Sequence, residues 1–140
     1  MAREAVEEQR FDAIVAVGGD GSINDVVAGL QGTSTPMGII PCGSGNGLAR
    51  NLRIPLIPAL AVKVLNQWHI ERIDTVSLNQ FTYASIAGVG FDALVARKMK
   101  QAKTRGLKAY AEIVAVDYPT SKEHVYQMTI DGREVERPAW

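Results

Sequence analysis

One pattern constrains the fold of this chain more than any other: an apolar run, a glycine-rich loop and a helical segment follow one another twice. The first apolar run is Phe11–Val17, which ends at Gly18–Gly21, and the second is Met37–Ile40, which leads into Gly43–Gly47. A nearly continuous apolar run is typical of a strand covered on both faces. The pattern therefore predicts an α/β fold with parallel strands, whose ligands bind beyond the carboxyl ends of the strands, where both loops fall.

Helices are expected after each loop. Ser22 has the properties of a helix start, because apolar residues follow it at helical spacing and Asp25 stands three residues on, as in a capping box. After the second loop, Leu48–Leu52 is typical of a short helix. Another helix is expected from Pro58 to about Asn66, since proline is favoured in the first helical turn.

The second half of the chain has a different pattern, with β-rich segments around two predicted helices. Asp131-Gly132, between two strand-like segments, is a strong hairpin turn. The expected elements are strands at 75–78 and 81–87, helices at 91–102 and 107–116, and hairpin strands at 124–130 and 133–136. This change predicts a domain boundary near residue 70, with an α/β domain over 1–70 and the start of a β-rich domain with a helical insertion over 71–140.

Composition narrows the class of protein. The formal net charge is zero, so the overall balance gives no reason to expect nucleic acid as a partner. Cys42 is the only cysteine, which excludes an intrachain disulfide. The polar start at 1–10 is unlike a signal peptide, and no apolar run approaches the ~20 residues that span a bilayer. We therefore expect a cytoplasmic protein whose contact with a membrane is at most peripheral.

The first glycine loop is suited to a phosphate group. Glycines leave the backbone bare, so phosphate oxygens can approach N–H groups closely, and the positive end of the following helix dipole would face the same place. Asp20 stands among these glycines and could hold a magnesium-bound water, since Mg²⁺ keeps several waters and takes few carboxylates. A plain glycine-rich turn before a capped helix explains the loop alone about equally well.

The second loop, Gly43–Gly47, alternates glycines with small polar side chains and is weak evidence by itself. Its expected position beside the first loop makes it more specific. Gly38–Ser44 has the spacing of a P-loop but lacks its lysine, and the Rossmann G-x-G-x-x-G and hydrolase G-x-S-x-G motifs do not occur. His69 and His124 lack metal-ligand spacing, so no histidine-based metal site is expected.

Three segments together resemble the motifs of the diacylglycerol kinase catalytic-domain family, which includes sphingosine kinases and bacterial lipid kinases. Residues 18–27, Gly-Gly-Asp-Gly-Ser-Ile-Asn-Asp-Val-Val, are similar to the signature G-G-D-G-T-x-N-E-V-V. Residues 38–50 and 87–93 resemble the second and third motifs, in the family's order. The resemblance implies an NAD-kinase-like parallel-sheet nucleotide domain, followed by the beginning of a β-rich lipid-substrate domain.

The resemblance also implies an activity and a site. A lipid kinase of this family moves the γ-phosphate of ATP to a hydroxyl of diacylglycerol or of a sphingoid-type lipid at a membrane surface, with ATP and Mg²⁺ as cofactors. Asp20 would be the catalytic residue, ordering magnesium through water near the phosphates together with Asn46. The implied nucleotide site comprises Gly18, Gly19, Asp20, Gly21, Ser22, Ile23, Asn24, Asp25, Gly43, Ser44, Gly45 and Asn46.

Departures from the family pattern bear on substrate and activity. Ser22 stands for the commoner threonine and Asp25 for glutamate, both mild changes. Gly47 replaces an aspartate of many bacterial diacylglycerol kinases, which slightly favours a sphingosine-type substrate. Family members carry one more strand before the part that matches 1–10 and continue past Trp140, where their proposed general base lies. We therefore expect a chain that is incomplete at both ends, has no assignable base and can be inactive on its own.

A basic stretch follows the third motif. It comprises Arg97, Lys98, Lys100, Lys103, Arg105 and Lys108, and the apolar stripe of the same predicted helix comprises Phe91, Leu94, Val95, Met99 and Ala102. Such a face could rest on anionic headgroups, each basic residue contributing about 1 kcal/mol. We favour the alternative, in which the stripe packs on the core and the basic side chains are solvated.

Two other functions stay open. NAD kinases and phosphofructokinases, which act on soluble substrates, also use a Gly-Gly-Asp-Gly loop, but they do not explain the second and third motifs. A non-catalytic nucleotide- or lipid-binding module is compatible with the missing base. The oligomeric state and the identity of the lipid are not encoded in any pattern that we recognise, and a homo-oligomer is compatible with the sequence.

Overall fold

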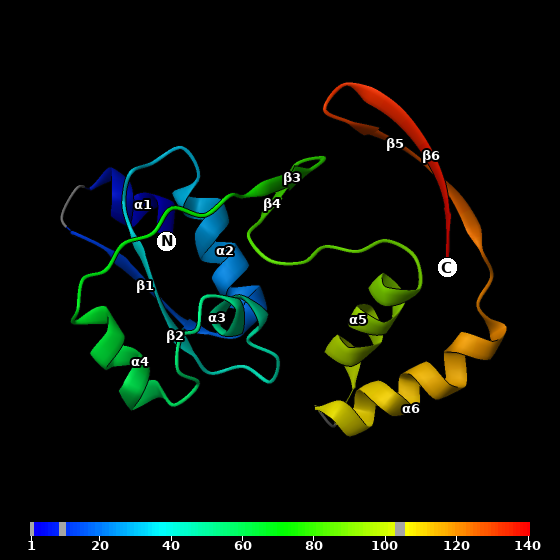
Figure 1. Cartoon of the computed structure of the whole chain (residues 1–140), viewed down its shortest axis with the longest axis horizontal. Coiled ribbons are helices and arrows are strands. Elements are labelled where there is room, and N and C mark those ends of the chain that lie inside the picture. The colour runs from blue at the N-terminus through cyan, green and yellow to red at the C-terminus, as the bar shows by residue number, and fades with distance from the viewer. Residues whose placement is uncertain (1, 9–10, 103–105) are drawn as a thin grey trace. The chain divides into compact units, whose positions relative to one another are not determined.

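The computed structural model describes residues 2–8, 11–102 and 106–140 (Figure 1). Contacts divide the chain into two compact units, Met1–Ile86 and Ala87–Trp140. This division rests on contacts within the chain, and the domain boundary near residue 70 stays a prediction. Within the described ranges, no helix combines the length and the apolar character needed to cross a membrane.

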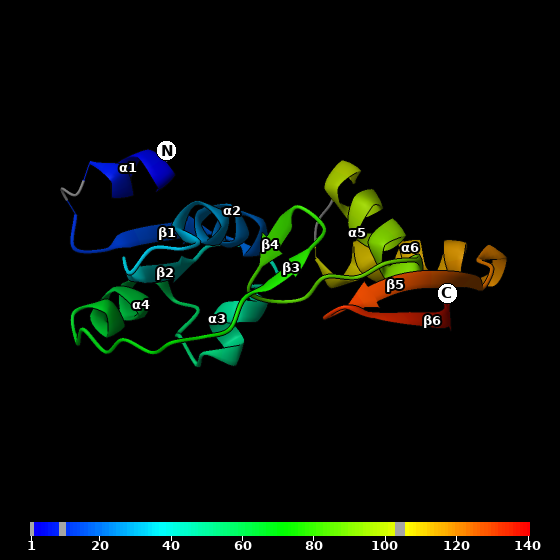
Figure 2. The same cartoon turned by 90° about the horizontal axis from the view of Figure 1, so that it is seen from above.

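The first unit is built on two parallel strands, β1 (Ile14–Gly18) and β2 (Met37–Pro41), which pair over their whole lengths. Between them in the chain lies α2 (Asp20–Leu30), and α4 (Pro58–Leu65) follows later. Figure 2 shows α2 and α4 on opposite faces of the strand pair. The predicted α/β class with parallel strands is therefore confirmed, and apolar strands are explained by helices on both sides.

The core of this unit joins α2 to the two strands. It is closed by the short helix α3 (Gly47–Asn51) and comprises Ala16, Ile23, Val27, Ile39, Leu48 and Ala49. On the opposite face α4 packs directly on β2, because a Cβ at Gly38 would lie 2.8 Å from Leu65 Cδ2. A short helix, α1 (Ala2–Glu7), precedes β1 and packs near α2, where Arg3 Nη1 donates to the Gln31 carbonyl at 3.0 Å.

A short hairpin completes the first unit. Its strands, β3 (Val76–Leu78) and β4 (Phe81–Tyr83), are antiparallel, and β4 packs against α2. Thr82 Oγ1 donates to Gln31 Oε1 at 2.7 Å, which ties the hairpin to the end of α2. The strand predicted over 81–87 is thus shorter than expected, because the chain leaves the hairpin after Tyr83.

The second unit contains two packed helices, α5 (Phe91–Gln101) and α6 (Leu107–Asp117), followed by a 3₁₀ turn at Tyr118–Thr120. Lys98 Nζ lies 2.6 Å from Asp117 Oδ1, so this lysine of the basic stretch pairs with an acid on α6. Val95 is buried in the same helix. Val95 packs inward as the favoured alternative expects, whereas Leu94 is 38% exposed and Lys98 is ion-paired rather than solvated. The choice between the two alternatives stays a prediction; Lys103 and Arg105 lie outside the described residues.

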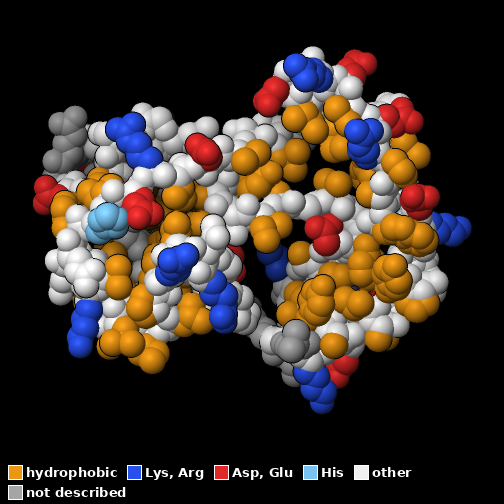
Figure 3. All heavy atoms as spheres, in the orientation of Figure 1, with side chains coloured by type: hydrophobic (Ala, Val, Ile, Leu, Met, Phe, Trp, Pro, Cys, Tyr) orange, Lys and Arg blue, Asp and Glu red, His pale blue; other side chains and the backbone are white. Residues whose placement is uncertain are grey.

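A hairpin of β5 (His124–Ile130) and β6 (Arg133–Ala139) ends the second unit. Asp131 and Gly132 have φ of 48° and 78°, as a tight two-residue turn requires, so the predicted turn is confirmed. β6 is longer than the predicted 133–136. Figure 3 shows hydrophobic side chains gathered on the visible face of this unit, and those of Val116, Val125 and Trp140 are exposed.

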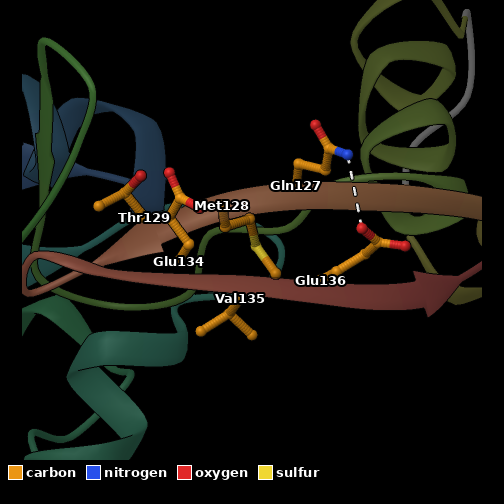
Figure 4. A pocket seen from close by; sticks show the side chains of 6 residues that line it. All are labelled: Gln127, Met128, Thr129, Glu134, Val135 and Glu136. Atoms are coloured by element: carbon orange, nitrogen blue, oxygen red, sulfur yellow. Dashed lines mark hydrogen bonds between the residues drawn. The ribbon is translucent and has the colours of Figure 1, made fainter.

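A pocket lies along this hairpin (Figure 4). Its polar side chains include a pair, in which Gln127 Nε2 donates to Glu136 Oε2 at 3.4 Å. All its lining residues come from the two hairpin strands: Gln127, Met128, Thr129, Glu134, Val135 and Glu136. It contains none of the residues that the sequence motifs singled out.

Candidate functional site

The parallel pairing of β1 and β2 brings the two glycine loops to one edge of the sheet. Gly18 lies opposite Pro41 at the carboxyl ends of the strands. The ladder continues one step further, because the Cys42 N–H donates to the Gly18 carbonyl at 2.8 Å. Both loops therefore leave the sheet side by side, at the edge where ligands of parallel sheets bind.

The two loops touch through bare backbone. A Cβ at Gly43 would lie 2.4 Å from Gly19 Cα, and a Cβ at Gly19 would lie 3.0 Å from Gly43 Cα. The first distance is far shorter than any real Cβ contact, so a side chain at Gly43 would force the loops apart. Glycine is required here because two main chains pass each other at contact distance.

The first loop runs straight into α2, which begins two residues earlier than predicted. Gly19 is the N-cap residue, in an extended conformation, and within the described part of the chain no side chain caps this helix end. The predicted capping box of Ser22 and Asp25 is therefore wrong, because Ser22 already lies in the first turn of the helix. The first N–H groups of α2, those of Asp20, Gly21 and Ser22, have no carbonyl acceptor inside the helix. They are available to an anion, which the helix dipole also favours.

Asp20 turns its half-buried carboxylate toward the second loop and α3. Its Oδ1 accepts a long hydrogen bond, 3.4 Å, from the Leu48 N–H. Cβ atoms at Gly45 and Gly47 would lie 3.0 Å from Oδ2 and 3.5 Å from Oδ1, respectively. The backbone of Gly45 and Gly47 thus lies close to the Asp20 carboxylate, and neither residue adds a side chain beside it.

The second loop is held together by its own residues. Asn46 has a left-handed conformation, with φ of 53° and ψ of 46°, and is only 5% exposed. Its Oδ1 accepts from the Gly43 N–H at 2.9 Å, and its Nδ2 donates to the Gly43 carbonyl at 2.7 Å. Arg50 Nε donates to the Gly45 carbonyl at 2.9 Å. Both polar atoms of Asn46 therefore point into the loop.

The other residues expected at the nucleotide site differ in accessibility. Ser44 and Asp25 are exposed, as are Gly21 and Ser22. Ile23 is a core residue, 1% exposed, and its N–H donates to the Gly19 carbonyl at 3.1 Å. The Asn24 side chain accepts from the Ala84 N–H at 3.3 Å and so connects α2 to the chain after β4.

Two residues at this site received no role from the sequence. Arg50 is the last residue of the second motif, and its Nε donates a hydrogen bond to the Gly45 carbonyl. Ser85 lies two residues before the third motif, and its Oγ lies 3.5 Å from the position that a Cβ at Gly47 would occupy. The short distance in sequence from Ser85 to a motif was the available signal, but only the folded chain brings it near Gly47.

The donor set around Asp20 suits magnesium held with few protein ligands. Among the described residues, no group of three histidine, cysteine, aspartate or glutamate side chains could hold a metal ion. Mg²⁺ commonly binds through one or two carboxylates, with waters and substrate phosphates completing its shell. One half-buried carboxylate beside a helix end whose first N–H groups lack acceptors inside the helix fits this mode of binding.

Comparison with known proteins agrees with the motifs. Residues 1–78 match the model of the family described as "Diacylglycerol kinase catalytic domain". Over 131 residues, the chain is 30% identical to "Uncharacterized protein sll0036" of Synechocystis sp., covering 94% of this chain and 30% of that protein. Over 85 residues, it is 33% identical to a "Diacylglycerol kinase" of Staphylococcus saprophyticus, covering 59% of this chain and 28% of that enzyme.

A solved structure supports the fold. The crystal structure of a diacylglycerol kinase from Bacillus anthracis is similar with a TM-score of 0.71 and 27% identity. The similarity covers 99% of this chain and 46% of the other. The chain thus has the NAD-kinase-like α/β fold that was predicted, and it spans about a third of the two curated relatives and about half of the solved one.

Proposed function

This chain belongs to the diacylglycerol kinase catalytic-domain family, and on that premise we propose that it forms the nucleotide-binding part of an ATP-dependent lipid kinase. The observation that carries the proposal is the contact between Gly19 and Gly43, which joins two glycine loops at the ligand-binding edge of a parallel sheet. One loop supplies N–H groups at the start of α2, and the other brings glycine backbone close to the Asp20 carboxylate.

ATP would bind with its phosphates against the first turn of α2. The N–H groups of Asp20, Gly21 and Ser22 can donate to phosphate oxygens, and the bare backbone at Gly19 allows close approach. Asp20 would hold Mg²⁺ through a water molecule. The ion, when bound, would neutralise charge on the phosphates. Phosphoryl transfer depends on this neutralisation and on the positioning of the reacting groups.

The acceptor would be the hydroxyl of a long-chain lipid, either diacylglycerol or a sphingoid-type base. The lipid part of the proposal is supported by the family match and by a relative named as a diacylglycerol kinase. Gly47, which stands where many bacterial diacylglycerol kinases have an aspartate, favours the sphingoid alternative slightly. We infer that the enzyme is cytoplasmic and meets its substrate at a membrane surface without spanning it.

A peripheral contact would involve the basic residues of α5 that form no ion pair with another described residue. Arg97 and Lys100 are exposed, whereas Lys98 is engaged by Asp117. Charge reversal at Arg97 and Lys100 together should weaken binding to vesicles of anionic phospholipid. Unchanged binding by that variant would contradict a membrane role for this face.

The activity can be tested with ATP that carries a radiolabelled γ-phosphate. The chain is incubated with Mg²⁺ and this ATP in the presence of diacylglycerol micelles, sphingosine micelles or NAD, and the products are separated. Label in a lipid supports the proposal and identifies the lipid. Phosphorylated NAD with unlabelled lipid would contradict it in favour of a soluble-substrate kinase. Saturable ATP binding without label in any product favours a non-catalytic nucleotide-binding module only if it persists in a protein of the full length of the curated relatives, of which this chain spans about a third.

A further inference from the structure

Asn46 has a geometry that does not suit the ordering of magnesium. Its side chain is 5% exposed, and its two polar atoms bind the N–H and the carbonyl of a single residue, Gly43. Asn46 Oδ1 lies 2.9 Å from the Gly43 nitrogen, and Asn46 Nδ2 lies 2.7 Å from the Gly43 carbonyl oxygen, so both atoms are directed at the loop backbone. The second lone pair of Oδ1 and the second hydrogen of Nδ2 are not used by Gly43, but at 5% exposure the buried side chain leaves little access for water or metal.

The residue held by Asn46 is the one that touches the first loop. Gly43 lies against Gly19, closely enough that a Cβ at Gly43 would meet the Gly19 Cα at 2.4 Å. The Gly43 position therefore decides how near the second loop comes to the N-terminus of α2. Asn46 has the left-handed backbone that lets its side chain reach back three residues, and asparagine tolerates that conformation better than most residues.

We propose that Asn46 is a positioning residue, which clamps Gly43 against Gly19 and so sets the spacing of the two loops before the nucleotide arrives. Arg50 acts on the same loop from the other side, through the Gly45 carbonyl. The second loop thus needs no ligand to take its shape. This inference rests on the proposed function for its effect on ATP, but the clamp itself is a property of the free protein.

The test compares three substitutions with one control. Asn46→Gly removes both hydrogen bonds and keeps the left-handed backbone accessible. Asn46→Asp keeps an acceptor for the Gly43 N–H but loses the donor to the Gly43 carbonyl. Asn46→Ala removes the bonds and adds backbone strain. Asn51→Ala, at an exposed position on α3, is the control. Thermal unfolding of each variant establishes that it is folded.

The first readout needs no nucleotide. Hydrogen exchange of the Gly43 amide, followed by NMR, should be slow in the parent chain and in Asn51→Ala, and at least about tenfold faster in folded Asn46→Gly, since its hydrogen bond is lost. Asn46→Asp should lie between them. Exchange at Gly43 that is unchanged in Asn46→Gly would overturn the clamp, whatever the ligand of the protein is.

The second readout is the affinity for ATP, measured with Mg²⁺ and again in EDTA. A positioning role predicts that Asn46→Gly weakens both affinities by a similar factor, about tenfold, and that Asn46→Asp is also weaker than the parent chain. If Asn46 instead ordered magnesium, Asn46→Gly would lose ATP affinity only when Mg²⁺ is present, and Asn46→Asp would bind ATP as tightly as the parent chain or more tightly. That result would overturn the proposal. If the parent chain binds no ATP, the proposed function fails, and the clamp is judged on the exchange of Gly43 alone.

Discussion

The two glycine loops look alike in sequence but are built in opposite ways. The first ends at an uncapped helix, whose leading N–H groups at Asp20, Gly21 and Ser22 have no acceptor within α2. The second has its polar groups satisfied internally, by Asn46 on Gly43 and by Arg50 on Gly45. Glycine richness alone therefore does not identify a binding loop. In the proposed site, the first loop would offer donors to a ligand, and the second loop would hold the first in place.

The largest effect is expected where the loops touch. Gly43→Ala should destabilise the protein by about 1–3 kcal/mol, because the new methyl group meets backbone rather than a flexible side chain. Urea unfolding monitored by circular dichroism measures the change. A Gly43→Ala variant as stable as the parent chain would mean that the loops are further apart than the structure has them.

The second effect concerns Asn24, which the family resemblance assigns to the nucleotide and the structure binds to the Ala84 N–H. Asn24→Ala should cost about 1 kcal/mol of unfolding free energy, as for one lost hydrogen bond that is partly offset by the better helix propensity of alanine. The matched change Asn51→Ala should cost less. If the two variants have the same free energy of unfolding, the Asn24 side chain does not hold the chain after β4 and is available to a ligand.

Gly21 provides the contrast to Gly43 within the first loop. A Cβ at Gly21 would meet no atom within 4 Å among the described residues. Gly21→Ala should therefore raise the unfolding free energy by about 0.5 kcal/mol, because alanine is the better helix former. A loss of stability comparable to that of Gly43→Ala would show that the two loops are packed alike and would remove the contrast between them.

The smallest effect is expected at Ser22, and it checks where α2 begins. If Ser22 were the N-cap residue, Ser22→Ala would cost about 1 kcal/mol. Since Gly19 is the N-cap residue, we expect a change within about 0.5 kcal/mol, in the stabilising direction. Chemical unfolding of the two proteins side by side separates these outcomes.

Much of the architecture could be read from hydrophobic patterning. The continuous apolar runs predicted β1 and β2 as a parallel pair, and Pro58 marked the first residue of α4. The helix start at α2 was misjudged because serine followed by an acid three residues later satisfies the capping pattern. The extended glycine at position 19 follows the end of β1 at Gly18 and caps the helix without any side chain, which composition alone does not reveal.

The finer features of the site depend on contacts between distant residues. The motif placed Asn46 in the second loop, but its bonds to Gly43 need a left-handed backbone, which residue order does not specify. Ser85 comes near Gly47 only because the chain after β4 packs beside α2. Sequence motifs could therefore locate the site without distinguishing the residues that face a ligand from those that shape the loops.

The most direct test of the account is a calorimetric titration of Mg-ATP into the chain and into Asp20→Ala. Asp12→Ala, at an exposed position before β1, is the matched control. We expect saturable binding by the parent chain and the control, and an affinity at least about tenfold lower for Asp20→Ala, as for the loss of a charged partner in the site. Absence of binding to the folded parent chain, or equal affinity of Asp20→Ala, would contradict a nucleotide site built from these two loops.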